Sequence, residues 1–589
     1  MRVQLKASLS LCFLIAAGIA LVLPVRAHPC CAPEHKVAQS QAAKVDEKKA
    51  DTLRQIQSLV ERVFRFQKIT PKINSLVAFA DFLWQIDQPY AKNLFLKSWD
   101  LVDAETSISA GQRNTATELS RLRGLIITHL SRHDAALALK LSERKPDQTE
   151  QLDKIRAAMS ALDGGVNPQQ AIKLAEQGWN GNVSGSSLTL IAFLQKLRRS
   201  EPAAANDFYL RVVERLASQP AIETNDLLTI GTYIYSSPVL TEATDAVTRD
   251  RDGLALYMQI GNALVVDITA NRPNVPAALV RAYLTAAVNV LTRPERNVTD
   301  ASLDAAALRL LLAKAQTALP EVVPAITSRL DQLAVPASEV DSARYTKNVQ
   351  PSVDEEIAKV DDLSGTERDQ KLFSLAFGLY RSGDLKRARS LAEKISDLPG
   401  RQKVLDALSF AEAAKQLESG AVVKAEALAN SLPVSTARAT LKVAIASHYS
   451  KLPDKARALE AAAIAANDCR RLENDRHKPY LLLALATVLT EVDAATAVTV
   501  LKEAVTAFNS TDKLYAEWFD TIQIGFVQRE FSLSLKLVDK EVPSCIEKLT
   551  RIEPDATMSL LATLTDETLQ GDSLVAFSRS IWKREVSNQ

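Results

Sequence analysis

Two histidines have a spacing that could serve metal chemistry. His129 and His133 are four residues apart in a segment whose apolar residues predict a helix. Both imidazoles would then lie on one helix face and could form half of a metal site. A zinc protease also needs a glutamate directly after the first histidine, and the intervening residues here are Leu130, Ser131 and Arg132. We interpret the pair as part of a surface helix and predict no metal site there.

A second group of possible ligands lies near the N-terminus. His28, Cys30, Cys31 and His35 fall within a short polar segment, and thiols and imidazoles are ligands for soft metals. The alternative is a flexible leader whose thiols oxidise or pair with another chain. No second ligand cluster in the sequence supports metal binding, so we predict no metal and no cofactor.

The sequence lacks the signatures of common enzymes. It contains no G-x-S-x-G, no Walker loop, no dinucleotide-binding glycine fingerprint and no H-E-x-x-H. Superhelical cell-wall lyases also have exported helical arms, but they add a compact domain with a catalytic Glu-Ser. The C-terminal acids Glu553, Glu567 and Glu585 have no such setting. We predict no enzymatic activity and no catalytic residue, and an envelope lyase or hydrolase on a superhelical scaffold is the alternative.

The N-terminal residues predict export. Arg2 and Lys6 precede an apolar run over residues 9–23, and Ala27 stands at the cleavage position before His28. The run is short for a bilayer span, which needs about 20 apolar residues. No later stretch competes as a membrane helix. We expect cleavage between Ala27 and His28, no stable membrane insertion afterwards, and a periplasmic or extracellular location in a bacterium.

The charges of the mature chain are balanced. From 71 basic residues, the loss of Arg2, Lys6 and Arg26 leaves 68, against 70 acidic residues. A nucleic-acid footprint needs a clustered basic face, and an anionic membrane attracts a polybasic patch. Neither is present, so we predict no nucleic-acid partner.

Four cysteines would survive cleavage of the signal. They are Cys30, Cys31, Cys469 and Cys545. A large helical chain does not need a disulfide framework, and we interpret Cys469 and Cys545 as buried helix residues. An even number in an exported protein still permits three pairings.

An apolar stripe with helical spacing recurs in the C-terminal half. Its members lie at i, i+3, i+4 and i+7 in three places: Ala388/Leu391/Ala392/Ile395, Ala425/Leu428/Ala429/Leu432 and Ala497/Val500/Leu501/Ala504. Between the first two stands another amphipathic helix, so the repeating unit is a helix pair. A pair cannot bury both of its faces alone, and serial copies must stack. We expect Ala388, Ala425 and Ala497 to be buried where two helices cross closely.

These patterns predict an all-α fold, a right-handed α-solenoid of stacked antiparallel helix pairs in two arms. After the signal peptide (1–27) we expect a flexible leader over 28–50 and a first arm over 51–333. A Pro-, Ser- and Asp-containing linker over 334–365 leads to a second arm over 366–589 that ends in a polar cap. Leu227 to Val239 contains β-branched and aromatic residues that could mark a strand, but its flanks are helical and we expect a helix.

The second arm resembles the tetratricopeptide-repeat superfamily over residues 366–510. The best match is Lys371 to Gly400, with Leu372, Leu375, Ala376 and Leu379 on the first helix, Ala388, Ala392 and Ile395 on the second, and then Pro399. Copies around Ala425, Ala456 and Ala497 fit less closely, and in the first arm only the layout of the pairs is similar. The resemblance implies a superhelix of helix pairs that binds partners on its surface.

The predicted function is therefore protein or peptide binding by a non-enzymatic envelope protein, with a purely structural spacer as a third possibility. We place the partner on the concave face formed by the first helices of successive pairs. In the second arm these helices are Lys371–Tyr380, Lys403–Lys415, Arg438–Tyr449 and Tyr480–Thr490. Candidate contact residues off the apolar stripes are Tyr380, Lys415, His448 and Tyr449.

Overall fold

The computed structural model of the chain describes most of the two arms. The described residues are 34–108, 113–144, 151–179, 186–218, 222–236, 257–260, 263–266, 270–272, 274–294, 296, 301–334, 353–360, 362–473, 476–511, 521–526, 529–534, 539 and 541–587. The predicted signal peptide, the Ala27–His28 cleavage site, Cys30, Cys31 and most of the predicted linker lie outside them.

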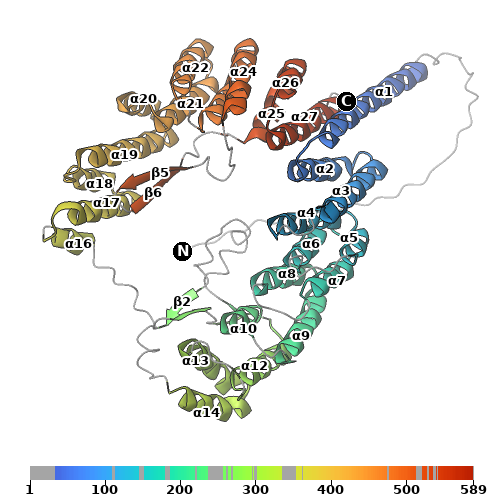
Figure 1. The fold of residues 1–589 in the computed structure, drawn as a ribbon, viewed down its shortest axis with the longest axis vertical. Helices are drawn as coiled ribbons and strands as arrows, with labels where there is room; N and C mark the ends of the chain where they lie inside the picture. The colour runs from blue at the N-terminus through green and yellow to red at the C-terminus, as the bar shows by residue number, and fades with distance from the viewer. Residues whose placement is uncertain are drawn as a thin grey trace, which may run out of the picture.

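The first arm is a series of helices that pack in pairs (Figure 1). Its helices are α1 (Glu34–Phe64), α2 (Ile69–Leu83), α3 (Gln88–Ile108), α4 (Arg113–Ser131), α5 (Ala135–Ser142), α6 (Gln151–Asp163), α7 (Pro168–Trp179), α8 (Ser187–Ser200), α9 (Pro202–Ser218), α10 (Thr224–Gly231), α12 (Ala277–Leu291), α13 (Ala301–Ala318), the 3-10 turn η3 (Pro320–Val322) and α14 (Val323–Leu333).

The second arm repeats the same arrangement. Its helices are α16 (Val353–Val360), α17 (Gly365–Arg381), α18 (Leu385–Ala392), α19 (Leu398–Glu418), α20 (Val422–Ser431), α21 (Thr436–Ser450), α22 (Lys455–Arg470), α23 (Lys478–Leu489), α24 (Ala494–Ser510), α25 (Val542–Ile552), α26 (Pro554–Leu561) and α27 (Glu567–Ser587). The chain is thus an α-solenoid of stacked helix pairs in two arms, which confirms the predicted fold class.

Short antiparallel strand pairs interrupt the helices. The segment predicted as a helix over Leu227–Val239 is helical only as far as Gly231, and the chain then extends at Tyr235, where β-branched and aromatic residues favour a strand. The three pairs are β1 (Tyr235–Ser236) with β4 (Ala270–Asn271), β2 (Tyr257–Ile260) with β3 (Ala263–Val266), and β5 (Thr521–Phe526) with β6 (Arg529–Ser534).

A local motif begins the second helix of many pairs in both arms. A side-chain carboxylate or amide oxygen accepts a hydrogen bond from a backbone N–H of the first helical turn, as an N-cap does. Four residues later stands an alanine with at most 1% of its surface exposed. The cap and alanine pairs are Asp87/Ala91, Asp134/Ala138, Asn167/Ala171, Asp384/Ala388, Asp454/Ala458 and Asp493/Ala497.

The alanines confirm the predicted packing and correct its register in one place. Ala388, Ala425 and Ala497 are all buried, as expected for small side chains at helix crossings. The buried alanine of the α21–α22 pair is Ala458, whereas Ala456 is exposed, because the cap at Asp454 sets the start of α22.

The repeat motif extends into the first arm, where the sequence suggested only a shared layout. Asp134 and Asn167 are 33 residues apart, and the buried Ala171 and Ala205 are 34 apart. These separations match the unit length of short helix-pair repeats. Part of the first arm therefore has the repeat length expected for helix pairs, although Asp87 and Asp134 are 47 residues apart.

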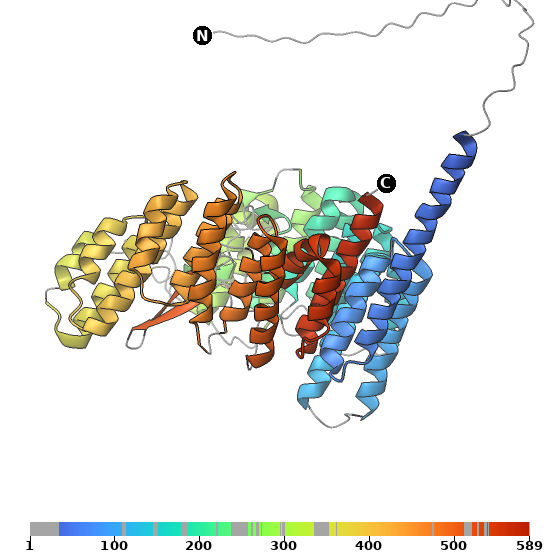
Figure 2. The same ribbon diagram turned by 90° about the horizontal axis from the view of Figure 1, so that it is seen from above.

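The two arms join through the opposite ends of the chain. The first helices of successive pairs stack in one row, α19–α21–α23–α25, and the row continues through α27 to α2, α4, α6 and α8. Helix α1 packs beside α27 and against α2. In the other pairs, the second helix takes this place beside its partner helix. Figure 2 shows α27 at the C-terminal end of the chain beside α1 and α2. One repeat unit is thus assembled from the first and the last helix.

Polar and steric contacts fix this junction. The Glu567 carboxylate accepts hydrogen bonds from the backbone N–H groups of Gln67 (2.6 Å) and Lys68 (2.9 Å), and so holds the chain directly before α2. Gly571 of α27 lies against the buried Ser75 of α2, and a Cβ placed on the glycine would be 1.9 Å from the Ser75 Oγ. A single hydrophobic core runs from the second arm through α27 into α1–α6.

The structure describes the segments at the ends of the arms in more detail than the sequence does. The middle of α27, where we expected a polar cap, is buried between the arms, including Leu574 and Phe577. Most of the expected flexible leader belongs to α1, whose Ala, Gln, Lys and Glu residues favour helix. The expected linker ends in helix α16, where Val360 is buried and Glu356 pairs with Lys371 at 3.0 Å.

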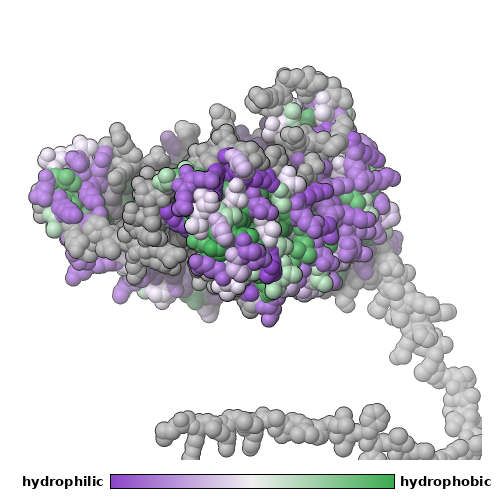
Figure 3. All heavy atoms as spheres, turned by 90° about the horizontal axis from the view of Figure 1, so that it is seen from below, coloured by the Kyte–Doolittle hydropathy of each residue, from purple (hydrophilic) through white to green (hydrophobic). Residues whose placement is uncertain are grey.

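The free ends of the stack are α14 and α16. Ile326 is the one fully buried residue of α14, and the half-buried Leu330 and Leu333 also pack against the core. Figure 3 shows hydrophobic residues among hydrophilic ones at this lower end of the molecule. Of the helices that the structure describes, none is long and apolar enough to cross a membrane.

Both cysteines of the second arm are buried thiols. Cys469 and Cys545 are free, and burial raises the pKa of each thiol to about 12. This confirms that they are core residues. The pairing of Cys30 and Cys31 concerns residues outside the described part of the chain.

Candidate partner-binding surface

The second arm has a groove between two neighbouring second helices. It has a volume of about 870 Å³ and lies between the C-terminal end of α22, the beginning of α23 and one face of α24. Most of the side chains around it are polar or charged. They are Arg470, Glu473, Arg476, Lys478, Leu482, Thr499, Lys502, Glu503, Thr506, Ala507, Ser510 and Thr511.

The amphipathic pattern of α24 explains its contribution to the groove. Ala497, Val500, Leu501, Ala504 and Val505 form the buried stripe that packs into the core. The opposite face has Thr499, Lys502, Thr506 and Ser510 at helical spacing, and all four are exposed. The floor of the groove is the buried Leu482 of α23.

Basic residues outnumber acidic ones around the groove. Arg470 donates two hydrogen bonds of 2.8 Å to the Glu503 carboxylate, and this contact raises the pKa of Arg470 above its ordinary value. The Lys478 ammonium donates to the Arg470 carbonyl oxygen at 2.8 Å, at the C-terminus of α22, where a cation is favoured. With Arg476 and Lys502 against Glu473, the groove has a net positive charge.

The residues predicted to contact a partner lie elsewhere on the second arm. Tyr380 is on α17, Lys415 on α19, and His448 and Tyr449 on α21, so none of them lines the groove. Lys415 is exposed, whereas Tyr380 and His448 are half-buried.

Tyr449 is not an accessible anchor, and this part of the prediction is wrong. Only 9% of it is exposed. Its hydroxyl donates to the Glu426 carboxylate of α20 at 3.3 Å, and the Arg457 guanidinium of α22 lies 5.3 Å from its ring centre. Tyr449 thus links α21 to α20 and α22. It lies outside the apolar stripe of its own helix, but the two neighbouring second helices bury it.

The concave face of the second arm offers few side chains to a partner. In Figure 1 the first helices α19 and α21 lie nearer the centre of the curve than α20 and α22. Helix α23 is apolar around its whole circumference, and only Lys478 and Val488 of its residues are not buried. The β5–β6 hairpin also reaches α19 on this side. Binding through the concave face stays a prediction, and the groove is on the other side of the stack.

The structure brings a carboxylate to the two histidines that sequence analysis singled out. The Asp81 Oδ1 of α2 is 2.8 Å from His133 Nε2 and 3.7 Å from His129 Nδ1, and Arg132 is 3.8 Å from the other oxygen. The His133 ring stacks on Trp84 with the ring centres 4.9 Å apart. Sequence spacing gave no sign of Asp81, because it comes from the neighbouring pair.

This cluster acts as a contact between α2 and α4. Burial alone would raise the pKa of the Asp81 carboxyl, but the hydrogen bond with His133 and the nearby His129 and His133 rings outweigh burial and hold that pKa well below its usual range. The nearby Arg132 adds a cation where a metal site would need electron-pair donors. Among the residues that the structure describes, no group of three or more His, Cys, Asp or Glu has metal-binding geometry.

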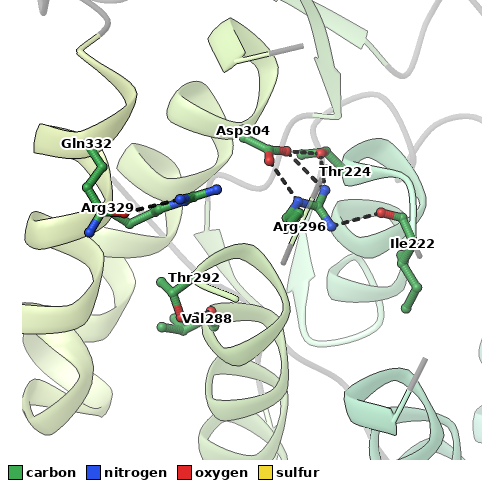
Figure 4. Close-up of polar contacts among 8 residues, drawn as sticks. All are labelled: Ile222, Thr224, Val288, Thr292, Arg296, Asp304, Arg329 and Gln332. Atoms are coloured by element: carbon green, nitrogen blue, oxygen red, sulfur yellow. Dashed lines mark hydrogen bonds and ion pairs between the residues drawn. The ribbon is translucent and has the colours of Figure 1, made fainter. Parts of the chain in front are cut away.

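A second buried polar cluster joins α10, α12 and α13 in the first arm (Figure 4). Arg296 donates to both Asp304 oxygens at 2.7 and 3.0 Å, to the Thr224 hydroxyl at 2.9 Å and to the Ile222 carbonyl at 3.0 Å. Only 11% of the Arg296 side chain and 4% of the Asp304 side chain are exposed. Hydrogen bonds engage both partners of this buried ion pair, so it fixes the orientation of the helices and presents no reactive group.

Comparisons with known proteins give little further information. No protein-family model matches the chain, and no curated protein matches it. The crystal structure of Ypp1 aligns with 91% of this chain and 87% of its own chain, at 11% identity and a TM-score of 0.24. A circular tandem repeat protein with a novel repeat topology aligns over 88% and 97%, at 9% identity and a TM-score of 0.18. Likenesses this distant carry no argument, and the assignment as a helical repeat rests on the chain's own helices.

Proposed function

We propose that this chain is an exported, non-enzymatic helical-repeat protein that binds a protein or peptide partner in a bacterial cell envelope. The observation that carries the proposal is the α22–α24 groove, an accessible and largely polar concavity on a stack of helix pairs, in the part of the stack where one core joins the second arm to α1–α6. Ligand sites are commonly concavities of about 300–1,000 Å³, and the groove falls within this range at about 870 Å³.

The scaffold suits a binding function. Stacked helix pairs form an extended rigid surface, on which neighbouring pairs place side chains at fixed distances. The closed junction between α27 and α2 supports this rigidity because it removes one pair of free ends. We further propose that the repeats are tetratricopeptide-like in both arms, on the basis of the capped, alanine-containing second helices.

The location rests on the N-terminal residues. Arg2, Lys6, the apolar run and Ala27 support export with His28 as the first residue of the mature chain. Sequencing the N-terminus of the protein recovered from an envelope fraction tests this part. Recovery only from the cytosolic fraction, with Met1 retained, would reverse it.

The binding function is tested by affinity capture with the mature protein from an envelope extract. We expect a specific partner to be retained at stoichiometric amounts after washing. A variant in which Tyr380 and Lys415 are both changed to alanine serves to locate the contact, because neither residue is in the groove. If the wild-type protein retains nothing beyond an unrelated helical-repeat control, the proposed function is wrong.

A further inference from the structure

We propose that the α22–α24 groove recognises an extended acidic segment of the partner protein. This inference rests on the proposed function and adds the chemistry of the ligand. Four basic residues border the groove, Arg470, Arg476, Lys478 and Lys502, against the two acids Glu473 and Glu503. Such an excess favours a ligand of the opposite charge.

The basic side chains come from separate elements that converge on one concavity. Arg470 ends α22, Arg476 lies in the loop that follows, Lys478 begins α23 and Lys502 lies on α24. Because α22 and α24 both pack on α23, their side chains are held at fixed positions on opposite sides of the groove. A ligand between them meets positive charge from both walls.

The exposed Lys502 is the best-placed group for a carboxylate of the ligand. It lies one residue before Glu503, whose two oxygens are already engaged by Arg470. Because Arg470 holds the Glu503 carboxylate, Glu503 does not compete with a ligand carboxylate for Lys502. The Lys478 ammonium donates to the Arg470 carbonyl oxygen and adds a second cation at the end of α22, across the groove from Lys502.

Hydroxyl groups make the groove suitable for a peptide backbone. Thr499, Thr506 and Ser510 follow one another along the exposed face of α24, and Thr511 continues the row. Each hydroxyl donates its proton to a backbone carbonyl of α24 and keeps lone pairs that can accept a hydrogen bond. An extended peptide presents N–H groups along its length, so the row can accept hydrogen bonds from its backbone while the lysines bind its carboxylates.

The interspersed acids favour a peptide over a nucleic acid. A phosphate backbone places negative charge at short, regular intervals and needs a continuous basic stripe. Here Glu473 and Glu503 interrupt the basic residues, and the mature chain has no excess of positive charge. A peptide whose acidic residues alternate with small neutral ones fits this mixed pattern.

The test measures fluorescence anisotropy with the intact mature protein. The probe is a short fluorescein-labelled peptide of alternating aspartate and alanine, compared with the same peptide carrying asparagine in place of aspartate. We expect saturable binding of the aspartate peptide that weakens as salt is raised, because the contacts are solvent-accessible ion pairs. The asparagine peptide should bind at least about tenfold more weakly.

Two lysine variants locate the site. Lys502→Glu should weaken binding of the aspartate peptide by about five- to tenfold, since it replaces an attraction with a repulsion at an exposed position. Lys502→Gln should have a smaller effect in the same direction. Lys424→Glu is the matched control, because Lys424 is also an exposed lysine on a second helix of the second arm but lies on α20, outside the groove. Circular dichroism should show unchanged helicity for all three variants.

The outcomes separate this inference from the proposed function. Equal binding of the two peptides, or an effect of Lys424→Glu with none of Lys502→Glu, overturns the acidic-ligand inference. If the protein retains an envelope partner equally well with and without Lys502→Glu, the partner binds elsewhere and only the inference fails. If nothing is captured by the wild-type protein, the proposed function itself fails.

Discussion

Gly571 is the position where the junction between the two arms has the least space. A Cβ there would lie 1.9 Å from the Ser75 Oγ, 3.0 Å from its Cβ and 3.3 Å from the Phe66 ring. The serine hydroxyl can rotate away, but its Cβ is fixed by the backbone of α2. Replacing Gly571 by leucine must therefore push α27 away from α2.

The expected cost follows from two opposing effects. Overpacking of a close contact costs about 1–3 kcal/mol, whereas replacing glycine within a helix gains up to about 1 kcal/mol. The balance for Gly571→Leu is a net loss of up to about 2 kcal/mol in the stability of the junction. Gly378 in α17 is the matched control, because a Cβ there meets no atom within 4 Å. Gly378→Leu should gain about 0.8 kcal/mol from helix propensity alone.

Hydrogen exchange read segment by segment is the appropriate assay, because a repeat array can open locally without unfolding as a whole. Gly571→Leu should increase exchange in α1, α2 and α27 and leave α21–α23 unchanged. Small-angle scattering should report a larger radius of gyration as the arms separate. If α2 keeps its full protection in Gly571→Leu, the close contact between α27 and α2 is not present in solution.

Three further predictions concern the pairs themselves. Ala388→Leu should destabilise the second arm by about 1–3 kcal/mol through overpacking, measured by urea unfolding; an unchanged midpoint would place Ala388 on the surface. Asp454→Ala should cost about 1 kcal/mol through loss of the α22 cap, visible as a lower melting temperature. The depressed pKa of Asp81 means that its contribution is present above the unfolded-state pKa of about 4 and is lost as pH falls below it. Asp81→Asn should flatten that acid-side loss of stability, and a slope equal to wild type would show that His129 and His133 do not hold a charged Asp81.

The helix pairs were predictable because their signals are local. An apolar stripe at helical spacing determines which face of a helix is buried, and this predicts the burial of Ala388, Ala425 and Ala497. The repeat in the first arm has an equally local signal that the stripes did not reveal. An Asp or Asn four residues before an alanine, as in Asp134 and Asn167, marks the start of a second helix there.

The junction and the groove could not be predicted in the same way. Glu567 and Gln67 are about five hundred residues apart in sequence, and no periodic pattern connects a carboxylate with a backbone N–H at that separation. The groove depends on the distance between α22 and α24 across α23, which is a property of packing. The error at Tyr449 has the same origin. Its position outside the apolar stripe of its own helix suggested exposure, but two neighbouring helices bury it.

The composite pair formed by α1 and α27 has a consequence for biosynthesis. A chain made from its N-terminus presents α1 and α2 long before α27 exists. The apolar face of α2 that later packs against α27 stays uncovered until α27 has been synthesised. A product truncated before α27 would contain all the other helix pairs described above and would still have two arms without a common core. The superhelix can therefore close only after α27 has left the ribosome.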